Sequence, residues 1–114
     1  MARRANKFSA IRTKTADGIS HDSKKEARKW EELKLLERAG EISHLERQVR
    51  IDLVVNCQVV GFTKIDFRYF DKRTKQLVLL DVKGYVNAAN AATRLWKLKY
   101  KIVEAMLGVP VTIV

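Results

Sequence analysis

The sequence predicts a mixed α/β domain whose elements follow the order α-β-β-β-α-β. Apolar residues recur at helical spacing over residues 23–39 and again over 91–107, which predicts two helices. Runs of β-branched and aromatic residues between and after them, separated by short polar turns, predict four strands. The chain has 114 residues, 46% of them apolar, which suffices for one modest core. We therefore expect a single domain over residues 23–114.

Residues 1–22 precede this domain and show no apolar periodicity. Their mixture of Arg, Lys, Asn, Ser, Thr and Gly, with a turn signal at Asp17-Gly18, predicts a flexible basic arm with a short strand near Ile19. The sequence contains no apolar run of signal-peptide or membrane-spanning length. We accordingly expect a cytoplasmic protein with no membrane partner.

The first helix is expected to begin at Ser23 and to end before Gly40. Ser23 and Glu26 form a capping-box pattern, in which each residue satisfies a backbone N–H group of the other. The inward stripe has helical spacing, with Glu26 at its edge, and consists of Ala27, Trp30, Leu33 and Leu36. The second helix covers about residues 91–107 and is stopped by Gly108.

The strands are expected to follow a linker at residues 41–47. Residues 49–60 and 62–70 have the composition of strands, and residues 77–82 are apolar on both faces, as in a central strand. Residues 111–114 are expected to form the last, short strand.

The alternation of residue types within residues 62–70 divides their side chains between two faces of the strand. Ile65, Phe67 and Tyr69 should share one face, and Asp66 and Arg68 should point the other way. The carboxylate of Asp66 is therefore expected to lie away from the apolar set.

The formal net charge of +10 usually indicates a polyanionic partner, most often nucleic acid. Residues 1–29 hold nine Lys and Arg against three acidic residues, residues 83–114 hold five against one, and residues 30–82 are neutral. Phosphate contacts are therefore predicted for basic residues of the arm and of the second helix, namely Arg3, Arg4, Lys7, Arg12, Lys14, Arg94, Lys97 and Lys101. The alternative is that these charges are only solvated.

Four residues combine into a candidate metal site. Asp81 and Lys83 lie two positions apart at the end of the central strand, so their side chains emerge on one face. Asp66 lies on the preceding strand, and Glu26 lies in the first turn of the first helix. If the two strands pair, their carboxylates can converge at one end of the sheet, where Mg²⁺ would take carboxylates, waters and phosphate oxygens as ligands. A lysine beside the ion can orient or deprotonate water, or stabilise transition-state charge.

Each of these residues also has a simpler interpretation. Glu26 can serve only as the partner of Ser23 in the capping box. Asp66 can pair with Arg68 as a surface ion pair of little consequence. Lys83 can be an ordinary lysine at a strand end. Taken jointly, in this order and setting, the residues favour the metal site.

The same residues resemble the PD-(D/E)XK nuclease superfamily, with Glu26 in a leading helix, Asp66 at a strand end and Asp81-Val82-Lys83 on the next strand. Longer strings are similar to a family of small phage and prophage proteins in that superfamily: Asp22-Ser-Lys-Lys-Glu-Ala-Arg28, Glu32-Leu-Lys-Leu-Leu-Glu-Arg-Ala-Gly-Glu-Ile42, Leu45-Glu-Arg-Gln48 and Asp81-Val-Lys-Gly84. The resemblance covers residues 18–110. It departs from the common pattern at Ile65, where proline is frequent.

The resemblance implies a restriction-endonuclease-like core and a Mg²⁺-dependent phosphodiesterase that acts on DNA, with Mn²⁺ as a substitute. It implies catalytic and metal-binding roles for Glu26, Asp66 and Asp81, a catalytic role for Lys83, and an accessory role for Gln48 at the start of a strand. A chain this small has little surface for enclosing a duplex, so by analogy with resolvases of similar size we expect a homodimer.

Two function classes remain open on this basis. The first is a metal-dependent DNA endonuclease, either specific for junctions or flaps or nicking, that works in phage recombination, replication or packaging. The second is a non-catalytic nucleic-acid-binding protein on the same scaffold. A weaker third is an RNA-binding accessory protein, because charge alone does not distinguish the two nucleic acids.

The remaining side chains of interest receive structural interpretations. Cys57 is the lone cysteine, and its valine neighbours predict that it is buried. His21 and His44 lack a metal-ligand pattern and are expected to be exposed. Aromatic residues on the helical stripes are expected in the core rather than as base-stacking platforms; these are Trp30, Trp96 and Tyr100.

Overall fold

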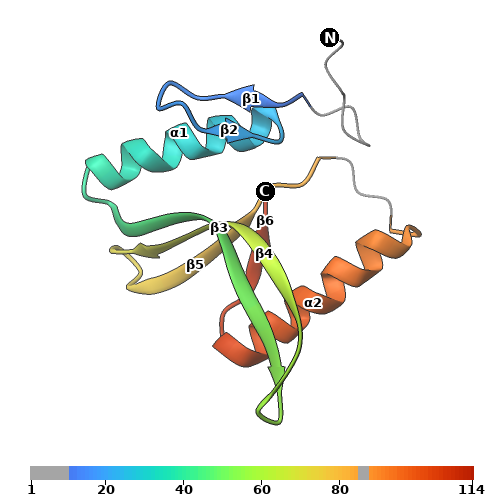
Figure 1. Cartoon of the computed structure of the whole chain (residues 1–114). Coiled ribbons are helices and arrows are strands. Elements are labelled where there is room, and N and C mark those ends of the chain that lie inside the picture. The colour runs from blue at the N-terminus through green and yellow to red at the C-terminus, as the bar shows by residue number, and fades with distance from the viewer. Residues whose placement is uncertain (1–10, 85–87) are drawn as a thin grey trace.

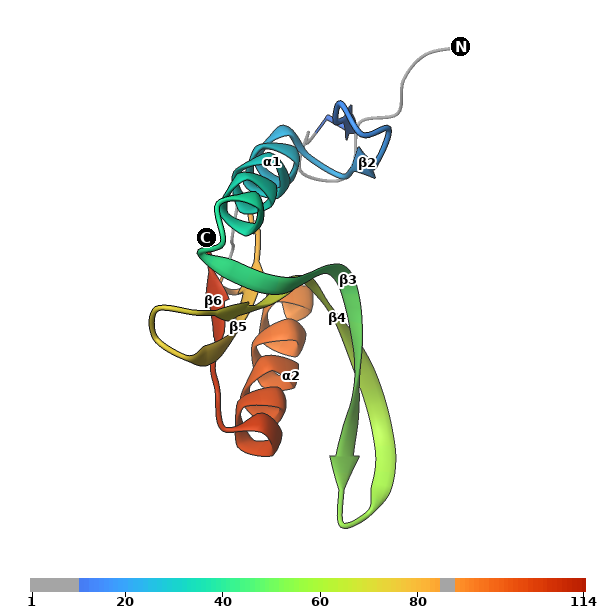
Figure 2. The same cartoon turned by 90° about the vertical axis from the view of Figure 1, so that its left-hand side faces the viewer.

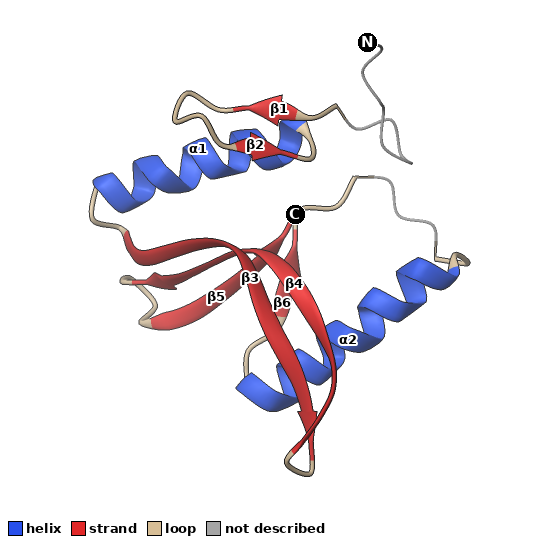
Figure 3. Ribbon diagram, in the orientation of Figure 1, coloured by secondary structure: helices blue, strands red, loops and turns tan. Residues whose placement is uncertain are grey.

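The computed structural model describes residues 11–84 and 88–114, and it has the predicted α-β-β-β-α-β order behind a small hairpin (Figures 1 and 3). The elements are β1 (Thr13–Lys14), β2 (Ser20–His21), α1 (Lys24–Arg38), β3 (Ile42–Val55), β4 (Gln58–Asp71), β5 (Gln76–Asp81), α2 (Ala91–Leu107) and β6 (Val111–Ile113). Strands β3 to β6 form one mixed sheet in that order, antiparallel except for the parallel β5–β6 pair. The predicted mixed α/β class is confirmed.

The two helices lie on opposite sides of this sheet, so the domain has two separate small cores (Figure 2). The core beneath α1 consists of Trp30, Leu33, Ile42, Phe67 and Leu80. The core beneath α2 consists of Val49, Ile51, Leu53, Ile65, Leu79, Tyr100 and Val103. Each helix is held mainly by burial of this apolar surface, which stabilises the fold by about 25 cal/mol per Å².

The ends of both helices agree with the sequence prediction. Ser23 is the N-cap of α1, and its Oγ accepts a hydrogen bond from the backbone N–H of Glu26 at 3.0 Å. Asn90 caps α2 in the same manner. Gly40 and Gly108 follow the helices with φ of +81° and +75°, a left-handed conformation that glycine adopts without steric cost.

The predicted linker at residues 41–47 is wrong, because β3 already begins at Ile42. The pairing of β3 with β4 shifts register between Ser43 and Glu46, and His44 has a φ of +55°. Such an irregularity breaks the alternation of apolar and polar residues on which the sequence prediction depends. The strand is therefore longer than its sequence pattern indicated.

Cys57 is exposed, which corrects the expectation that it is buried. It lies with Asn56 in the two-residue turn of the β3–β4 hairpin, and their φ values are +65° and +48°. Two consecutive positive φ values are typical of the tight hairpin turn whose twist matches that of the strands. The valines around Cys57 belong to the outer part of this hairpin and are largely exposed themselves.

Residues 13–21 form a hairpin that is fixed to α1, which differs from the flexible arm expected over residues 1–22. The strand expected near Ile19 is present as β2. The carboxylate of Asp17 accepts hydrogen bonds from Lys34 Nζ and Trp30 Nε1, each at 2.7 Å. The bond from Lys34, with others from Thr15 and Trp30, lowers the pKa of Asp17 well below its usual value. The hairpin thus packs along one flank of α1, and Ile19 joins the core beneath this helix (Figure 1).

Candidate active site and metal centre

The long β3–β4 hairpin bends at the position where Gln48 faces Asp66. Gln48 lies between the paired residues Arg47↔Phe67 and Val49↔Ile65, and its φ is +52°. Beyond the bend Ile65 joins the core beneath α2, whereas Phe67 joins the core beneath α1. The expectation that Ile65 and Phe67 share a face is therefore wrong, and the bend places Asp66 between the two cores.

Strand pairing brings Asp66 and Asp81 together. Phe67 pairs with Leu80 at the end of the paired segment, and Asp66 and Asp81 are the next residues beyond this pair. The backbone N–H of Asp66 donates to Asp81 Oδ1 at 3.2 Å, and the N–H of Val82 donates to Asp66 Oδ2 at 2.8 Å. Asp81 is only 2% exposed. The two carboxylates thus lie side by side where β4 and β5 stop pairing.

Glu26 reaches the same place from the first turn of α1. Its backbone N–H is bonded to the N-cap Ser23, and its side chain, in a residue 5% exposed, points to the sheet. Gln48 Nε2 donates to Glu26 Oε1 at 3.0 Å and to Asp66 Oδ1 at 3.3 Å. The capping interaction and a place in the cluster are therefore compatible, and Gln48 reaches the cluster as the sequence suggested.

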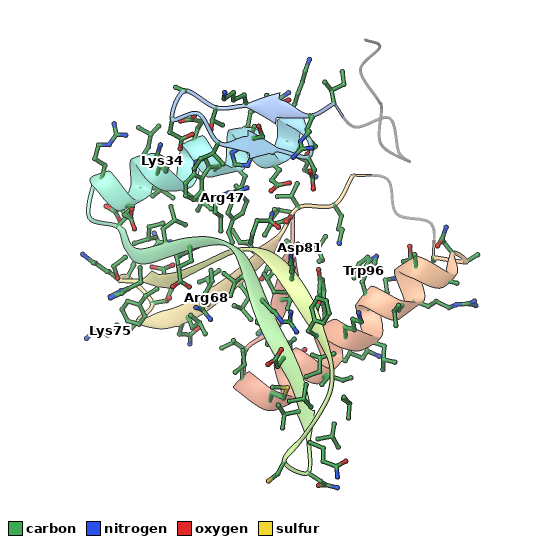
Figure 4. All side chains as sticks on the ribbon, viewed as in Figure 1. Lys34, Arg47, Arg68, Lys75, Asp81 and Trp96 are labelled. Carbon is green, nitrogen blue, oxygen red and sulfur yellow. The ribbon has the colours of Figure 1, made fainter. Side chains whose placement is uncertain are left out.

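Lys83 completes the predicted quartet on the other side of Asp81. Its Nζ lies 2.8 Å from Asp81 Oδ2, the oxygen that also accepts the hydroxyl hydrogen of Tyr100. The same ammonium group lies 4.8 Å above the ring of Trp96 and 5.6 Å above that of Tyr100. The interpretation of Trp96 and Tyr100 as core residues therefore missed their contacts with the site (Figure 4 labels Asp81 and Trp96).

The crowding of carboxylates changes their protonation. Burial, then the negative charges of Asp81 and Glu26, raise the pKa of Asp66 to about 8. Burial and the bond to Asp81 also raise the pKa of Tyr100, so its hydroxyl remains a donor. A cluster of this kind is stable only when it holds a proton or another positive charge.

His21 belongs to this cluster, although the sequence predicted it to be exposed. It is 1% exposed, and its Nδ1 lies 3.7 Å from Glu26 Oε1. It was missed because it sits on β2 just before α1, where neither strand nor helix periodicity relates it to Glu26. His44, by contrast, is exposed as predicted.

The basic residues predicted to contact phosphate lie on several surfaces. Arg12 and Lys14 are exposed beside and on β1, and three more are exposed along α2, namely Arg94, Lys97 and Lys101. The remaining three, Arg3, Arg4 and Lys7, lie outside the described residues.

Further cations lie on α1, which the sequence analysis did not single out, and one of them contacts the backbone beside the acidic cluster. Lys25 Nζ donates to the backbone oxygen of Lys83 at 3.1 Å. Lys25, Arg28 and Lys29 line a 230 Å³ cleft whose lining also includes Glu32, Val82 and Val114. The available sequence signal was the spacing of Lys25, Arg28 and Lys29 at i, i+3 and i+4 on one helix.

The residues present suit a divalent cation in their chemistry. Carboxylate oxygens, an amide and a buried imidazole converge, and burial together with the neighbouring negative charges raises the pKa of Asp66 to about 8. Within residues 11–84 and 88–114, however, no three acidic, histidine or cysteine side chains are already gathered around one point. Gln48 occupies the space between Glu26 and Asp66, so a cation bound there would require this amide to move or turn.

Comparison with known proteins identifies a family for the chain. A family model described as "Protein of unknown function (DUF1064)" matches residues 5–109. The chain belongs to the DUF1064 family. No curated protein and no solved structure matches this DUF1064 protein. Neither helix in the described part of the chain is long and apolar enough to cross a membrane.

Proposed function

We propose that this DUF1064 protein is a metal-dependent DNA endonuclease of the PD-(D/E)XK type. The observation that carries the proposal is the convergence of Glu26, Asp66 and Asp81, with Lys83 bonded to Asp81 at 2.8 Å. The contacts that link Glu26, Gln48, Asp66 and Asp81 each join a different pair of elements, so proximity along the chain does not account for the carboxylate cluster; the contact of Lys83 with Asp81 is local. Raised carboxylate pKa values in a charged cluster are a frequent property of catalytic sites.

The proposed mechanism assigns a task to each side chain. Glu26, Asp66 and Asp81 would hold Mg²⁺ or Mn²⁺, which when bound lowers the pKa of a coordinated water and offsets charge on the scissile phosphate. Lys83, held between Asp81 and the ring of Trp96, would donate to the attacking water or to a phosphate oxygen. Asp66, whose pKa is raised to about 8, must lose its proton for this, so cation affinity should rise with pH.

The strong positive charge of the chain supports DNA as the substrate. The exposed cations of α1 and α2 lie on the two helices that flank the acidic cluster, and each can contribute a phosphate contact. The resemblance to phage and prophage proteins suggests work in phage recombination, replication or packaging, in the cytoplasm of the host cell. The assay described below identifies which form of DNA is cleaved.

A homodimer is part of the proposal, and the outer β3–β4 hairpin is its proposed interface. Its exposed apolar side chains are Val54, Val55, Val59, Val60 and Phe62. The segment 50–62 carries one positive and one negative charge, Arg50 and Asp52, which pair at 3.2 Å. The charges of this segment cancel, so two copies of a chain with net charge +10 should repel less through it than through the basic faces of the helices. Light scattering should give a dimer mass for the wild type and a monomer mass for Val59→Glu.

The test is a cleavage panel with supercoiled, linear, single-stranded, flap and four-way-junction DNA, in Mg²⁺, Mn²⁺ or EDTA. We expect cleavage of at least one substrate with either cation, none in EDTA, and none by Asp81→Asn. The exposed Glu104 of α2 provides a matched control, Glu104→Gln, which should cleave normally. Tight DNA binding without cleavage under every condition would instead favour the non-catalytic DNA-binding protein, and preferential binding of RNA would favour the accessory protein.

A further inference from the structure

A buried histidine at the edge of the acidic cluster has no task in the proposed mechanism. The ring centroid of His21 lies 6.2 Å from that of Trp30, and its Nδ1 has no hydrogen-bond partner within the described part of the chain. An unsatisfied polar atom in a residue that is 1% exposed costs about 1–3 kcal/mol. A structure that tolerates this cost at the edge of a charged cluster is consistent with a ligand for that atom.

The contacts of the opposite ring nitrogen determine which nitrogen carries the proton. His21 Nε2 lies 3.4 Å from Thr15 Oγ1. The single hydroxyl hydrogen of Thr15 already has two acceptors, the carboxylate of Asp17 and the backbone oxygen of Ile19. Thr15 Oγ1 therefore acts as the acceptor and Nε2–H as the donor. In the neutral ring this leaves a lone pair on Nδ1.

The lone pair on Nδ1 faces a carboxylate oxygen at a distance that suits a shared cation. The 3.7 Å between His21 Nδ1 and Glu26 Oε1 is too long for a hydrogen bond, because a side-chain contact of about 3.6 Å no longer counts as one. It is shorter than about 4.2 Å, the sum of two cation–ligand bonds of about 2.1 Å. One ion can therefore contact both atoms, and it would relieve the repulsion between two electron-rich groups.

Gln48 shows how a positive group is already accommodated at this place. Its Nε2 directs hydrogens at Glu26 and Asp66, as a cation would direct positive charge. A half-turn of the amide exchanges Nε2 for Oε1, which is an acceptor and a suitable cation ligand. The turn requires no change in the backbone.

We propose that His21 Nδ1 and the Glu26 carboxylate bind the same divalent cation, and that this nitrogen ligand makes the site prefer Mn²⁺ to Mg²⁺. Mg²⁺ favours oxygen ligands, whereas imidazole suits transition metals better. The inference rests on the metal-dependent activity proposed above, for which it specifies the cation. It also gives β2 a function, since this strand delivers the nitrogen ligand to the site.

The test measures Mn²⁺ directly, without reference to cleavage. Untagged, EDTA-stripped full-length protein is titrated with Mn²⁺, and bound Mn²⁺ is followed by electron paramagnetic resonance, with spin-echo modulation reporting a coordinated imidazole nitrogen. The chain contains two histidines, so His21→Asn is compared with the matched variant His44→Asn at the exposed position. Thermal unfolding in EDTA checks that each variant is folded.

We expect the nitrogen modulation in wild type and in His44→Asn, and its loss in His21→Asn. Affinity for Mn²⁺ should fall about tenfold or more in His21→Asn, while competition by Mg²⁺ should change little, since the Asn amide supplies an oxygen. If His21→Asn does not fold, the spectrum of His44→Asn decides the question, because His21 is the one histidine left in that variant.

The outcomes separate this inference from the proposed function. Bound Mn²⁺ without nitrogen modulation, together with Asp81-dependent cleavage, overturns the role of His21 and leaves the nuclease intact. Modulation that persists in a folded His21→Asn overturns it as well, because another nitrogen is then the ligand. Absence of any bound Mn²⁺ or Mg²⁺ contradicts both.

Discussion

The two sides of the acidic cluster differ in how well their charges are satisfied. On the Asp81 side, both carboxylate oxygens have donors, and the ammonium group of Lys83 supplies a full positive charge beside Tyr100. On the Glu26 side, Glu26 and Asp66 share one neutral amide, and the nearby His21 has an unpartnered nitrogen among the described residues. The difference teaches that the Asp81 side already holds Lys83 in a fixed position. The Glu26 side, by contrast, has too little positive charge to balance its carboxylates.

The largest expected effect comes from removing the ammonium group of Lys83, on the Asp81 side of the cluster. Lys83→Ala should lower single-turnover cleavage at saturating DNA by about 10³-fold, because a charge aimed at the reacting phosphate is lost. Lys75→Ala removes the same charge from the exposed β4–β5 loop, far from Asp81 in Figure 4, and should have no effect. Wild-type cleavage by folded Lys83→Ala would remove this lysine from the mechanism.

A second effect concerns the Glu26 side, where the protonation of Asp66 should change the folding stability of the protein. The pKa of Asp66 is raised from 3.8 to about 8, so the folded state binds this proton more tightly than the unfolded chain does. The resulting stabilisation is fully present below about pH 4 and is lost as pH rises through about 8. Asp66→Asn removes the titration, and it should stabilise the cation-free protein by about 2–4 kcal/mol near pH 8.

The measurement for Asp66 is denaturant unfolding in EDTA between pH 4 and pH 9. The difference between wild type and Asp66→Asn isolates this group from the other titrating residues, and exposed Glu104→Gln is the matched control. Parallel pH curves for wild type and Asp66→Asn would mean that the carboxylates are not crowded. Excess Mg²⁺ should reduce the difference, because it stabilises only the ionised cluster.

DNA affinity should depend on surfaces outside both sides of the cluster. Deleting residues 1–10 removes Arg3, Arg4 and Lys7 and leaves β1 in place, so the slope of log K against log salt should flatten by up to about 2.7. Replacing Arg94, Lys97 and Lys101 with Gln should have a similar effect. Fluorescence anisotropy across a salt series gives both slopes. Unchanged slopes would indicate that these charges are only solvated and that the cations of α1 carry the contacts.

The smallest effect is expected at the hydroxyl of Tyr100. Tyr100→Phe removes one of the donors to Asp81 while Lys83 remains, so stability should fall by about 1 kcal/mol and cleavage by about tenfold. Tyr69→Phe, at a partly buried tyrosine that packs on the core beneath α1, controls for loss of a hydroxyl. Equal effects of the two changes would mean that Tyr100 has only a packing role.

Much of the framework could be predicted from local patterns. Helix ends follow from caps and glycines whose effect lies within one turn, as at Ser23 and Gly108. The meeting of Asp66 with Asp81 follows from two adjacent strands joined by a short loop. These features depend on few residues that are close in sequence, so one sequence suffices to indicate them.

The parts that escaped prediction depend on contacts between distant segments. The bend at Gln48 places Ile65 and Phe67 in different cores. The alternation of apolar and polar residues gives no sign of this bend, because the positive φ that accompanies it occurs at a residue other than glycine. His21 and Tyr100 reach the cluster from elements whose packing no local pattern specifies. Their side chains also suit ordinary surface or core positions, so residue type alone gave no signal.

The parallel pairing of β5 with β6 has a consequence for the order in which the molecule is assembled. The N–H of Val114 donates to the backbone oxygen of Asp81 at 3.0 Å, and the N–H of Lys83 donates to that of Val114 at 3.2 Å. The backbone around Asp81 and Lys83 is thus fixed by a segment that leaves the ribosome after all of α2. Contacts of such long sequence separation form late, because the intervening loop must close first. A nascent chain therefore contains Glu26, Asp66 and Asp81 well before β6 can pair with β5 and fix the geometry of their cluster.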